Sequence, residues 1–594
     1  VYDKNENRQF EFGAAAPLIS DADTVGSEQD VSIEIAKTFT FQDAPFLAAS
    51  ALGTNGISFS DPSLRALTFL SLAAAAEIMA ELAQRLAGRR HVAAIEELLC
   101  RRPLVFSKDR LALRIKARRV ESAEKSIAQV RVQIREDSPG DEWTRPAMEC
   151  TVILKTRRPE RAAFVRQSLF KPRNVHWTDR EIYPGRLSSG PLLQAIKRAD
   201  VWSEEGLDYT VEVPPLADAV AHTRFPVWVV NPQLLAAVTD GFALWRSHER
   251  FKGAFSVAFR VRKITFWTEN FPEGARLNCY LRLTDATPKS HICDIHVTEG
   301  NGNLLMEIAG FEELVERVNE GYRQLVLEPS VSYLTDRLLP KELGNPDCTV
   351  ASALVTDVPY PLFERQHGLW LQTISGIVLA SSERRTFADM PGSVSRKTEW
   401  LFGRIAAKEA VRRYLHDNYQ ARWASADVQI WADHQGKPHP LGAWSDFLAV
   451  KIDLAIAHTQ KFVAAVVAGN SRVGIDVEER ERDLSEEFAK GVFTPEELEL
   501  AVHCGRGIDG MIRFWCAKEA VSKALGTGIR FPPKEMVVAA FAPETGEMTV
   551  LLSGQWLDAF KNFKGRPVKV SSSIVRGHVL ATCFLPESLF TNEV

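Results

Sequence analysis

One five-residue segment occurs twice in the second half of the chain. Ala-Lys-Glu-Ala-Val stands at residues 407–411 and again at 517–521, and Leu415 and Leu525 match at the same separation. These are mostly good helix formers, so two unrelated helices could share the segment by composition alone. The chemistry that flanks the second copy favours the alternative, a two-fold structural repeat. This alternative constrains the fold most, because it requires two similar halves.

Length and composition bound the class of protein. The chain has 594 residues, too many for one hydrophobic core, so we expect two to four domains. Hydrophobic residues make up 45% and charged residues 25% of the sequence, as in ordinary globular proteins. The 72 basic and 76 acidic residues give a net charge of −4. This balance gives no electrostatic reason to expect binding to nucleic acid or to an anionic membrane.

The cysteines and the apolar runs point to the cytoplasm. The 8 cysteines form no C-x-x-C pair, so we expect reduced thiols and no zinc site. The most apolar run, Ala66–Ala76, is too short to span a bilayer. The sequence shows no signal peptide, and it begins with Val1 rather than Met, which suggests a piece of a longer chain. We therefore expect a cytoplasmic protein with no membrane partner.

Two segments of the first half predict helix starts of the same kind. Asp61-Pro62 and Asn231-Pro232 each combine a short capping side chain with a proline, which suits the first turn of a helix. We expect these helices to end near Leu86 and Arg246. Strand-like sequence follows each helix, at residues 111–120, 127–135, 255–264 and 276–283, and residues 300–303 predict a hairpin turn. One helix followed by antiparallel strands, occurring twice, predicts a duplicated α+β unit.

These patterns divide the chain into four parts. The stretch around Pro340–Asp347, with its proline and aspartate residues, marks the boundary between the two halves. We expect a flexible lead-in, a duplicated α+β domain, a linker and a C-terminal domain with a two-fold repeat, at residues 1–30, 31–330, 331–348 and 349–594.

A pair of carboxylates lies in the segment Val473–Glu478. The β-branched residues of this segment predict a strand end, and residues i and i+2 of a strand share a face, so Asp476 and Glu478 point the same way. Two carboxylates on one face suit a hard cation such as Mg²⁺. The alternative is a solvated acidic strand end, because the sequence continues with further acidic residues from Glu479 onwards.

The segment Phe514–Lys523 predicts a helix that complements this pair. Trp515, Glu519 and Lys523 are spaced i, i+4 and i+8, so they share one helix face. On that face Glu519 could supply a third carboxylate to the cation, and Lys523 could neutralise a phosphate. The alternative is an ordinary surface ion pair between Glu519 and Lys523, worth roughly 0.2–0.5 kcal/mol.

Further cations and one histidine precede the acidic pair. His458 ends a predicted strand, and Gly436-Lys437-Pro438 predicts a turn that carries a cation. The helix predicted for residues 397–415 carries three cations along one side: Lys397, Arg404 and Lys408. Such a stripe suits a phosphate, although basic stripes on helices are usually only solvated faces.

In this order, the motifs resemble those of the surfactin-type 4′-phosphopantetheinyl transferases. The shared motifs are an early helix, G-K-P, G-I-D-x-E and W-x-x-K-E-x-x-x-K, at residues 399–408, 436–438, 474–478 and 515–523. The usual serine before the histidine is absent, because Ala457 precedes His458. The resemblance covers about residues 350–594. It implies two similar α/β halves around a pseudo-two-fold axis with the site between them, which agrees with the Ala-Lys-Glu-Ala-Val repeat.

The resemblance also implies roles for individual residues. Mg²⁺ would be held by three carboxylates: Asp476, Glu478 and Glu519. Coenzyme A would be bound by Arg404, Lys408, Lys437, Pro438, His458, Lys518 and Lys523. Of these, Arg404, Lys408 and Lys437 would lie near its 3′-phosphate. The catalytic residues would be Glu519 as the base, Lys523 and His458. The reaction would move the 4′-phosphopantetheine arm of coenzyme A onto a serine of an acyl carrier protein.

The first half resembles the double-hotdog dehydratase domains of polyketide and polyunsaturated fatty acid synthases. Three segments stand where that family has its motifs, at residues 43–50, 187–194 and 231–236. That family dehydrates with one histidine and one aspartate, but the two positions read Ser50 and Ala236 here. Asp240, one turn later, is the sole acid of its predicted helix. We therefore expect an inactive hotdog domain.

Two interpretations of the whole chain stay open. In the first, an inactive hotdog scaffold carries a transferase that primes the acyl carrier protein of its own multienzyme, as in iterative synthases of the enediyne and polyunsaturated type. In the second, the chain is bifunctional, and the hotdog dehydrates 3-hydroxyacyl chains with Asp240 or another base. Double hotdogs often self-associate, so a homodimer through this domain is a further expectation.

Overall fold

The computed structural model describes residues 16–25, 31–53, 56–88, 90–121, 124, 126–138, 145–157, 160, 163–251, 253–269, 271–365, 368–503 and 507–590. The chain divides into two units. The first contains Val1–Asn55 and Arg65–Glu328, and the second contains Gly56–Leu64 and Pro329–Val594. Among the described residues, no helix has both the length and the apolarity needed to cross a bilayer.

The first unit is built on one antiparallel sheet whose strand order repeats. Within the described residues the sheet is 13-stranded, in the order β1-β2-β6-β7-β8-β5-β12-β15-β14-β13-β11-β10-β9. Outwards from the central β5–β12 pair, β5-β8-β7-β6-β2 on one side corresponds to β12-β15-β14-β13-β11 on the other. A helix precedes each central strand, α2 before β5 and α4 before β12. The predicted duplication is therefore confirmed, and the unit is a double hotdog.

The elements of the first unit alternate between long strands and a few helices. Its strands are β1 (Asp23–Thr24), β2 (Ser32–Thr40), β3 (Ala51–Leu52), β4 (Leu67–Thr68), β5 (His91–Cys100), β6 (Arg110–Val120), β7 (Ile127–Glu136), β8 (Met148–Lys155), β9 (Arg173–Thr178), β10 (Ile196–Ser203), β11 (Gly206–Glu212), β12 (Ala254–Phe266), β13 (Arg276–Ala286), β14 (Ser290–Thr298) and β15 (Leu304–Arg317). Its helices are α2 (Leu72–Ala87), α3 (Asp179–Gly185), α4 (Pro232–Arg246) and α5 (Glu320–Leu327), with a 3₁₀ turn, η1, at Pro45–Ala49.

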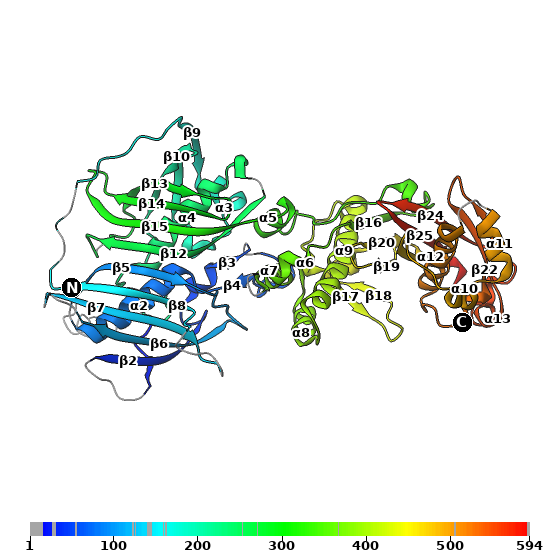
Figure 1. Ribbon diagram of the computed structural model, residues 1–594, viewed down its shortest axis with the longest axis horizontal. Coiled ribbons are helices and arrows are strands. Elements are labelled where there is room, and N and C mark those ends of the chain that lie inside the picture. The colour runs from blue at the N-terminus through cyan, green and yellow to red at the C-terminus, as the bar shows by residue number, and fades with distance from the viewer. Residues whose placement is uncertain are drawn as a thin grey trace. The chain divides into compact units, whose positions relative to one another are not determined.

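The two central helices pack against the sheet and contact each other. α2 packs against β5 to β8, α4 packs against β10, β11, β13 and β14, and α2 contacts α4 (Figure 1). α4 begins as predicted, because Asn231 accepts the N–H of Leu234 at 3.0 Å and Pro232 takes the first helical position. The prediction for α2 was wrong by about ten residues, since α2 begins at Leu72 behind the Ser71 cap. The Asp61-Pro62 segment lies in residues 56–64, which belong to the second unit.

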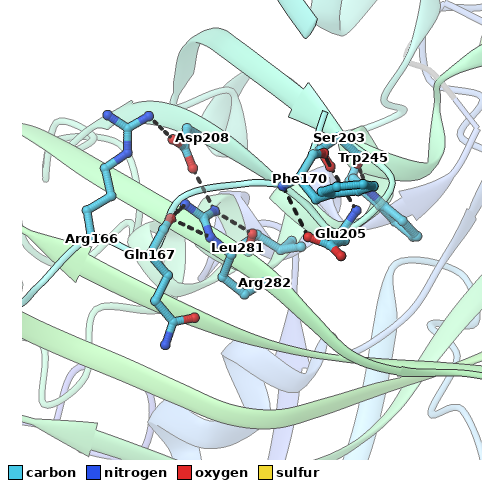
Figure 2. A network of polar contacts seen from close by, with 9 residues as sticks. All are labelled: Arg166, Gln167, Phe170, Ser203, Glu205, Asp208, Trp245, Leu281 and Arg282. Atoms are coloured by element: carbon cyan, nitrogen blue, oxygen red, sulfur yellow. Dashed lines mark hydrogen bonds and ion pairs between the residues drawn. The ribbon is translucent and has the colours of Figure 1, made fainter. Parts of the chain in front are cut away.

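The segment that leads into the second hotdog is held by a polar network on β11 and β13 (Figure 2). Asp208 accepts hydrogen bonds from Arg166 and from Arg282, the latter at 2.6 Å. Arg282 also donates to the Gln167 carbonyl at 2.7 Å, and the Ser203 hydroxyl donates to the Phe170 carbonyl at 2.7 Å. Since Asp208 is buried and both of its charged partners reach it, the network fixes this segment on the sheet.

Residues 16–25 differ from the flexible lead-in that the sequence predicted. Leu18 and Ile19 are buried in the core of the first unit. Their backbone N–H groups donate to the carboxylate of Glu81 on α2, at 3.1 Å each for the Oε2 atom. A pair of apolar side chains and an internal acceptor therefore fix this stretch.

Glu77, one turn before Glu81, joins the two halves of the double hotdog. Its buried carboxylate accepts the N–H groups of Val229 and Val230, just before α4, at 2.7 Å each. Burial raises the pKa of Glu77 to about 7, although the two N–H donors oppose the shift. Burial and the charge of Glu77 raise the pKa of the neighbouring Glu81 well above its ordinary value, so the folded pair holds a proton in a pH range where the unfolded chain has released it.

This pKa predicts how the stability of the first unit depends on pH. Because the folded form binds the proton of the Glu77–Glu81 pair more tightly, the free energy of unfolding should fall as the pH rises from the ordinary glutamate value of 4.5 through about 7. We expect Glu77→Gln to reduce this slope in urea unfolding between pH 5 and 8. Glu121→Gln, at an exposed site, should leave the slope unchanged. An unchanged slope in Glu77→Gln would contradict the prediction.

The second unit consists of two halves, each with one long helix on a small antiparallel sheet. The elements of the first half are β16 (Val350–Val355), α6 (Tyr360–Glu364), α7 (Leu369–Val378), α8 (Ser381–Asp389), α9 (Val394–Tyr419), β17 (Gln429–Ala432), β18 (Pro438–Leu441), β19 (Ile452–His458) and β20 (Val463–Gly469). The elements of the second half are β21 (Ser471–Glu479), α10 (Glu486–Val492), α11 (Pro495–His503), α12 (Gly507–Leu525), β22 (Met536–Ala542), β23 (Glu547–Leu552), α13 (Gly554–Ala559), β24 (Val568–Val575) and β25 (His578–Pro586).

The sheets of the two halves are β16-β20-β19 and β21-β25-β24-β23-β22. α9 packs on β16, β19 and β20, and α12 packs on β21, β24 and β25 (Figure 1). The two copies of Ala-Lys-Glu-Ala-Val lie on these two helices. The predicted pair of similar α/β halves is therefore confirmed.

The segment expected to be a linker, residues 331–348, is an integral part of the second unit. Leu338 and Leu343 are buried in a core shared with β21 and β25. The hydroxyl and N–H of Thr335 donate to the buried carboxylate of Glu409, at 2.6 and 3.0 Å. Residues 56–64 also form part of the second unit, since Asp427 accepts hydrogen bonds from two N–H groups and two hydroxyls of residues 58–60. The unit therefore needs more of the chain than residues 349–594.

Candidate active site

Gly474 brings helix α12 directly onto strand β21. A Cβ atom at Gly474 would stand 1.8 Å from the carbonyl oxygen of Ala520 and 2.6 Å from the backbone nitrogen of Ala524. No side chain fits in that space, so only glycine permits this approach. As a result, the side chains that follow on β21 face those of α12.

The acidic pair of β21 and the polar face of α12 meet as the sequence predicted. Asp476 Oδ1 accepts a hydrogen bond from Lys523 Nζ at 2.7 Å, and Glu478 Oε1 accepts one from Trp515 Nε1 at 3.2 Å. Both face predictions, i and i+2 on the strand and i, i+4 and i+8 on the helix, are confirmed by these contacts. Glu478 also pairs with Arg482, four residues later.

The carboxylates of this cluster repel one another. Burial raises the pKa of Glu519, and the charges of Asp476 and Glu478 raise it further, while Lys523 opposes them. Burial alone would lower the pKa of Lys523, but Asp476 and Glu519 outweigh it, so that the pKa is raised. Burial and the charges of Asp476 and Glu478 also raise the pKa of the Cys516 thiol, which stays protonated. The cluster therefore has an excess of negative charge that one lysine does not balance.

The donor set suits a hard divalent cation. Asp476 Oδ2 is buried and has no hydrogen-bond partner among the described residues. Such an orphaned oxygen, beside two further carboxylates, is the kind of ligand that Mg²⁺ prefers. In the part of the chain that the structure describes, no three His, Cys, Asp or Glu side chains are already gathered around a point where a metal ion would sit. The residues thus fit the cation in chemistry, and the carboxylates would have to close around it.

The turn that carries Lys437 reaches the same helix from the first half. Gly436 takes a positive φ of 84° in the turn between β17 and β18, and Pro438 begins β18. Lys437 Nζ donates to Asp453 Oδ2 at 2.7 Å and lies 3.5 Å from the carbonyl oxygen of Lys523. The Lys437 turn therefore lies beside the C-terminal part of α12.

Asp453 ties strand β19 to strand β21. Its Oδ2 accepts the N–H of Val473 at 2.8 Å as well as the Lys437 ammonium. Sequence reasoning gave Asp453 no role, although an acid inside an otherwise apolar strand was a signal for one. At the far end of β19, His458 is exposed.

Arg404 lies partly buried on α9. Its guanidinium stacks on Trp400, 4.6 Å from the ring centre, and its Nε is 3.8 Å from Glu383 Oε1. Burial lowers the pKa of Arg404, and Glu383 opposes the shift. Lys397, at the start of the same stripe, lies over the ring of Phe387 at 5.5 Å.

Lys408 and Lys518 do not have the ligand-binding position that the sequence predicted. Both are fully buried, and each ammonium already has three acceptors. For Lys408 these are the carbonyls of Val378 and Ser425 and the Glu383 carboxylate. For Lys518 they are the carbonyls of Val492 and Pro533 and the Glu497 carboxylate. The two lysines are equivalent structural centres of the two halves, and no ammonium N–H is left for a phosphate.

The segments of the first unit that carry Ser50 and Asp240 are linked by hydrogen bonds through residues 189 and 190. The Gly190 N–H donates to the Ala49 carbonyl at 2.9 Å, which places Ser50 beside the 188–190 segment. From that segment the Ser189 hydroxyl donates to Asp240 Oδ2 at 2.6 Å. Burial raises the pKa of Asp240 to about 6, against the effect of Ser189. Ala236, one turn earlier on α4, is buried and has no reacting group.

Comparisons with known proteins match both units. Residues 472–583 match the 4′-phosphopantetheinyl transferase superfamily, and residues 181–315 match the polyketide synthase dehydratase N-terminal domain. A holo-[acyl-carrier-protein] synthase of Shewanella amazonensis is 31% identical over 119 residues, which cover 19% of this chain and 95% of that protein. The synthase of Bacillus subtilis is 32% identical over 90 residues, 15% of this chain and 71% of that protein.

Solved structures of dehydratase domains align with about half of the chain. The domain from the CurJ module of curacin polyketide synthase aligns with a TM-score of 0.37 and 16% identity, over 51% of this chain and 96% of that domain. The CurF domain aligns with a TM-score of 0.39 and 13% identity, over 51% of this chain and 100% of that domain. The strand order of the sheet and its two central helices define the fold of the first unit.

Proposed function

The chain belongs to the 4′-phosphopantetheinyl transferase superfamily, and on this premise we propose that it transfers phosphopantetheine from coenzyme A to a serine of an acyl carrier protein, with Mg²⁺. The observation that carries the proposal is the meeting of Asp476 and Glu478 on β21 with Glu519 and Lys523 on α12. Three carboxylates with an orphaned oxygen and one adjacent ammonium suit a cation and a pyrophosphate side by side.

Each residue of the cluster has a role in this proposal. Asp476, Glu478 and Glu519 would hold Mg²⁺, which would neutralise the charge of the pyrophosphate. Lys523, which lies beside these carboxylates, would bind a phosphate oxygen of the pyrophosphate. The positive charge for the 3′-phosphate would come from Lys437, in the turn that Pro438 fixes, and from Arg404. The exposed His458 would contact the pyrophosphate.

The proposed reaction is a displacement at phosphorus. The carrier serine hydroxyl attacks the β-phosphorus of coenzyme A, a new P–O bond forms, and the bond to the α-phosphate oxygen breaks, so that 3′,5′-bisphosphoadenosine leaves. Glu519 takes the serine proton, directly or through a water. Lys523 stabilises the charge that develops on the phosphate oxygens. Catalysis is thus mostly positioning and charge neutralisation.

A mass measurement tests the proposal. The full chain, coenzyme A and Mg²⁺ should convert an apo acyl carrier protein to its phosphopantetheinylated form, which intact-protein mass spectrometry detects. Removal of the metal with EDTA should stop the conversion, and added Mg²⁺ should restore it. Conversion that continues in EDTA would contradict the metal assignment, and no conversion with any carrier protein would contradict the function.

A variant of Arg404 tests the site of the 3′-phosphate. We expect Arg404→Ala to weaken coenzyme A far more than 3′-dephospho-coenzyme A, by roughly 10- to 150-fold, because one charge-assisted contact is lost. The measurement is the KM of both substrates. Arg396→Ala, an exposed arginine on the same helix, is the matched control. Equal losses for both substrates would move the 3′-phosphate elsewhere.

For the first unit we propose a scaffold without dehydratase activity. Dehydration needs a base beside the thioester and an acid for the leaving hydroxyl, and the two family positions hold Ser50 and Ala236. A role as a scaffold, in which the unit places the transferase in a multienzyme beside its carrier protein, or dimerises it, needs only the sheet and its helices. Asp240, with its raised pKa, is the observation that favours the bifunctional alternative.

Incubation of the full chain with a 3-hydroxyacyl carrier protein distinguishes the inactive scaffold from the bifunctional alternative. We expect no loss of water above background by mass spectrometry, because each missing acid–base group is worth roughly 10²–10⁴-fold. Efficient dehydration that Asp240→Asn abolishes would show that the site has been rebuilt around Asp240.

A further inference from the structure

A pocket in the first unit adjoins the degenerate dehydratase positions but does not include them, since Ser188 and Ala243 line it. It is a half-open pocket with a cavity volume of about 100 Å³, and it is formed by residues 186–188, the end of α4, the start of β12 and helix α5. Its walls are partly apolar, with side chains from Leu187, Ala243, Phe255, Val326 and Leu327. Neither Ser50, Ala236 nor Asp240 lines it.

Three arginines line this pocket, and they are incompletely neutralised. Arg323 pairs with Glu320 at 3.0 Å, and Arg246 pairs with the buried Glu313 at 2.6 Å. Arg186 forms no salt bridge with a carboxylate among the described residues. Its guanidinium stacks on Trp177, 3.9 Å from the ring centre, and donates to the carbonyl and hydroxyl oxygens of Ser247 at 3.4 Å. Three guanidinium groups thus face two directly paired carboxylates, and the pocket has an excess of positive charge.

Two further carboxylates act on Arg186 without bonding to it. Burial lowers the pKa of Arg186, and the charge of Arg323 lowers it further, while Glu181 and Glu249 oppose the shift. The net direction remains downward, so the two carboxylates do not compensate for burial. An anion bound in the pocket would compensate for this burial, because a negative charge nearby stabilises the charged guanidinium.

Arg246 is the buried arginine of this pocket. It uses Nη1 for Glu313 and Ser256, whereas its Nε and Nη2 are buried without an acceptor among the described residues. The end of α4 that carries it is fixed, because Trp245 Nε1 donates to the Ser203 carbonyl at 2.8 Å (Figure 2) and Trp202 Nε1 donates to the Trp245 carbonyl at 2.9 Å. Because Nε and Nη2 have no accessible surface, Arg246 contributes positive charge to the wall of the pocket, and direct contacts with a ligand fall to the other two arginines.

We propose that this pocket binds a small organic oxyanion, a carboxylate or a phosphate ester joined to a short apolar chain. Arg186 and Arg323 take the oxygens, in the forked geometry that guanidinium offers to both kinds of head group, and the apolar walls take the chain. The pocket gives the first unit a ligand-binding role that needs neither Ser50 nor Ala236. It is independent of the transferase chemistry of the second unit.

Calorimetric titration of the full chain with three six-carbon probes tests this site. Hexanoate and hexyl phosphate carry the two anionic heads, and hexanol carries none. At least one anion should bind about 10-fold or more tightly than hexanol, and the tighter anion identifies the head group. Arg186→Gln and Arg323→Gln should each weaken that anion about 10-fold or more. Arg180→Gln, an exposed arginine on α3 outside the pocket, should not.

Two readouts keep the outcome clear. Transferase activity should be unchanged in all three variants, so a failure of this site is distinguishable from a failure of the proposed function. Thermal melting identifies a misfolded variant. If Arg186→Gln is misfolded, the partly exposed Arg323→Gln decides alone. Anions that bind no more tightly than hexanol, or that bind folded variants as tightly as the wild type, would overturn the proposal.

Discussion

Asp476→Ala should remove phosphopantetheine transfer while the second unit stays folded. Asp476 is the one carboxylate of the cluster that contacts Lys523 directly, and its second oxygen is buried without a partner among the described residues. Without Asp476 the proposed cation would lose a ligand, and the charge that positions Lys523 would disappear. We expect a loss of at least about 10²–10³-fold in kcat/KM for the carrier protein, because electrostatic groups of this kind contribute that much each.

The fold should tolerate this change, because Asp476 does not hold its strand in place. β21 is paired with β25 through its backbone, and the Asp476 side chain accepts a hydrogen bond from Lys523, whose side chain is partly exposed. Glu479→Ala, an exposed carboxylate on the same strand, is the matched control and should retain activity. Near-normal transfer by Asp476→Ala in millimolar Mg²⁺ would exclude Asp476 as a metal ligand.

Local patterns predicted the elements around this cluster well, because they depend on short-range geometry. The period of a strand placed Asp476 and Glu478 on one face, and the period of a helix placed Trp515, Glu519 and Lys523 on another. Both were correct. Neither pattern says how close the two faces come, and that distance is set by Gly474, whose role depends on the carbonyl of Ala520 across the contact.

The same patterns were misleading for charged residues whose environment is set by the fold. Lys408 and Lys518 occupy equivalent positions in the repeat, and this equivalence was a signal that they are structural. A residue needed once, at a single site between two halves, has no reason to recur in both. Glu409 and Glu519 also recur, but Thr335 and Leu334 cap the first, whereas the second lies beside Asp476 and Glu478. Only contacts with residues distant in sequence distinguish the structural Glu409 from Glu519 of the acidic cluster.

Domain boundaries were the least predictable feature, for a related reason. The Asp61-Pro62 dipeptide has the composition of a helix start, yet Ser58 and Ser60 donate hydrogen bonds to Asp427, more than 300 positions along the chain. A carboxylate that accepts several N–H and O–H donors can outweigh a local helix preference of a few tenths of a kcal/mol per residue. No local pattern in residues 56–64 points to that partner.

Gly474→Ala should destabilise the second unit and disturb the active-site cluster at the same time. The added Cβ would overlap the carbonyl oxygen of Ala520, which belongs to the backbone of α12 and cannot rotate away. Either α12 or β21 must move, at a cost of roughly 1–3 kcal/mol or more in the free energy of unfolding. A displacement of about 1 Å between them would also separate Lys523 from Asp476, and a misplacement of that size can cost about 10²-fold in rate.

The expected result is therefore a double loss, in melting temperature and in transfer, which separates this variant from Asp476→Ala, where transfer alone falls. Gly491→Ala is the matched control, because its Cβ on α10 meets no atom within 4 Å and its φ is not positive. Alanine there should leave both properties unchanged or raise the melting temperature slightly. If Gly474→Ala melted and reacted like the wild type, the close approach of α12 to β21 could not be what assembles the cluster. The metal site would then have to form by a larger movement of the two elements than the structure indicates.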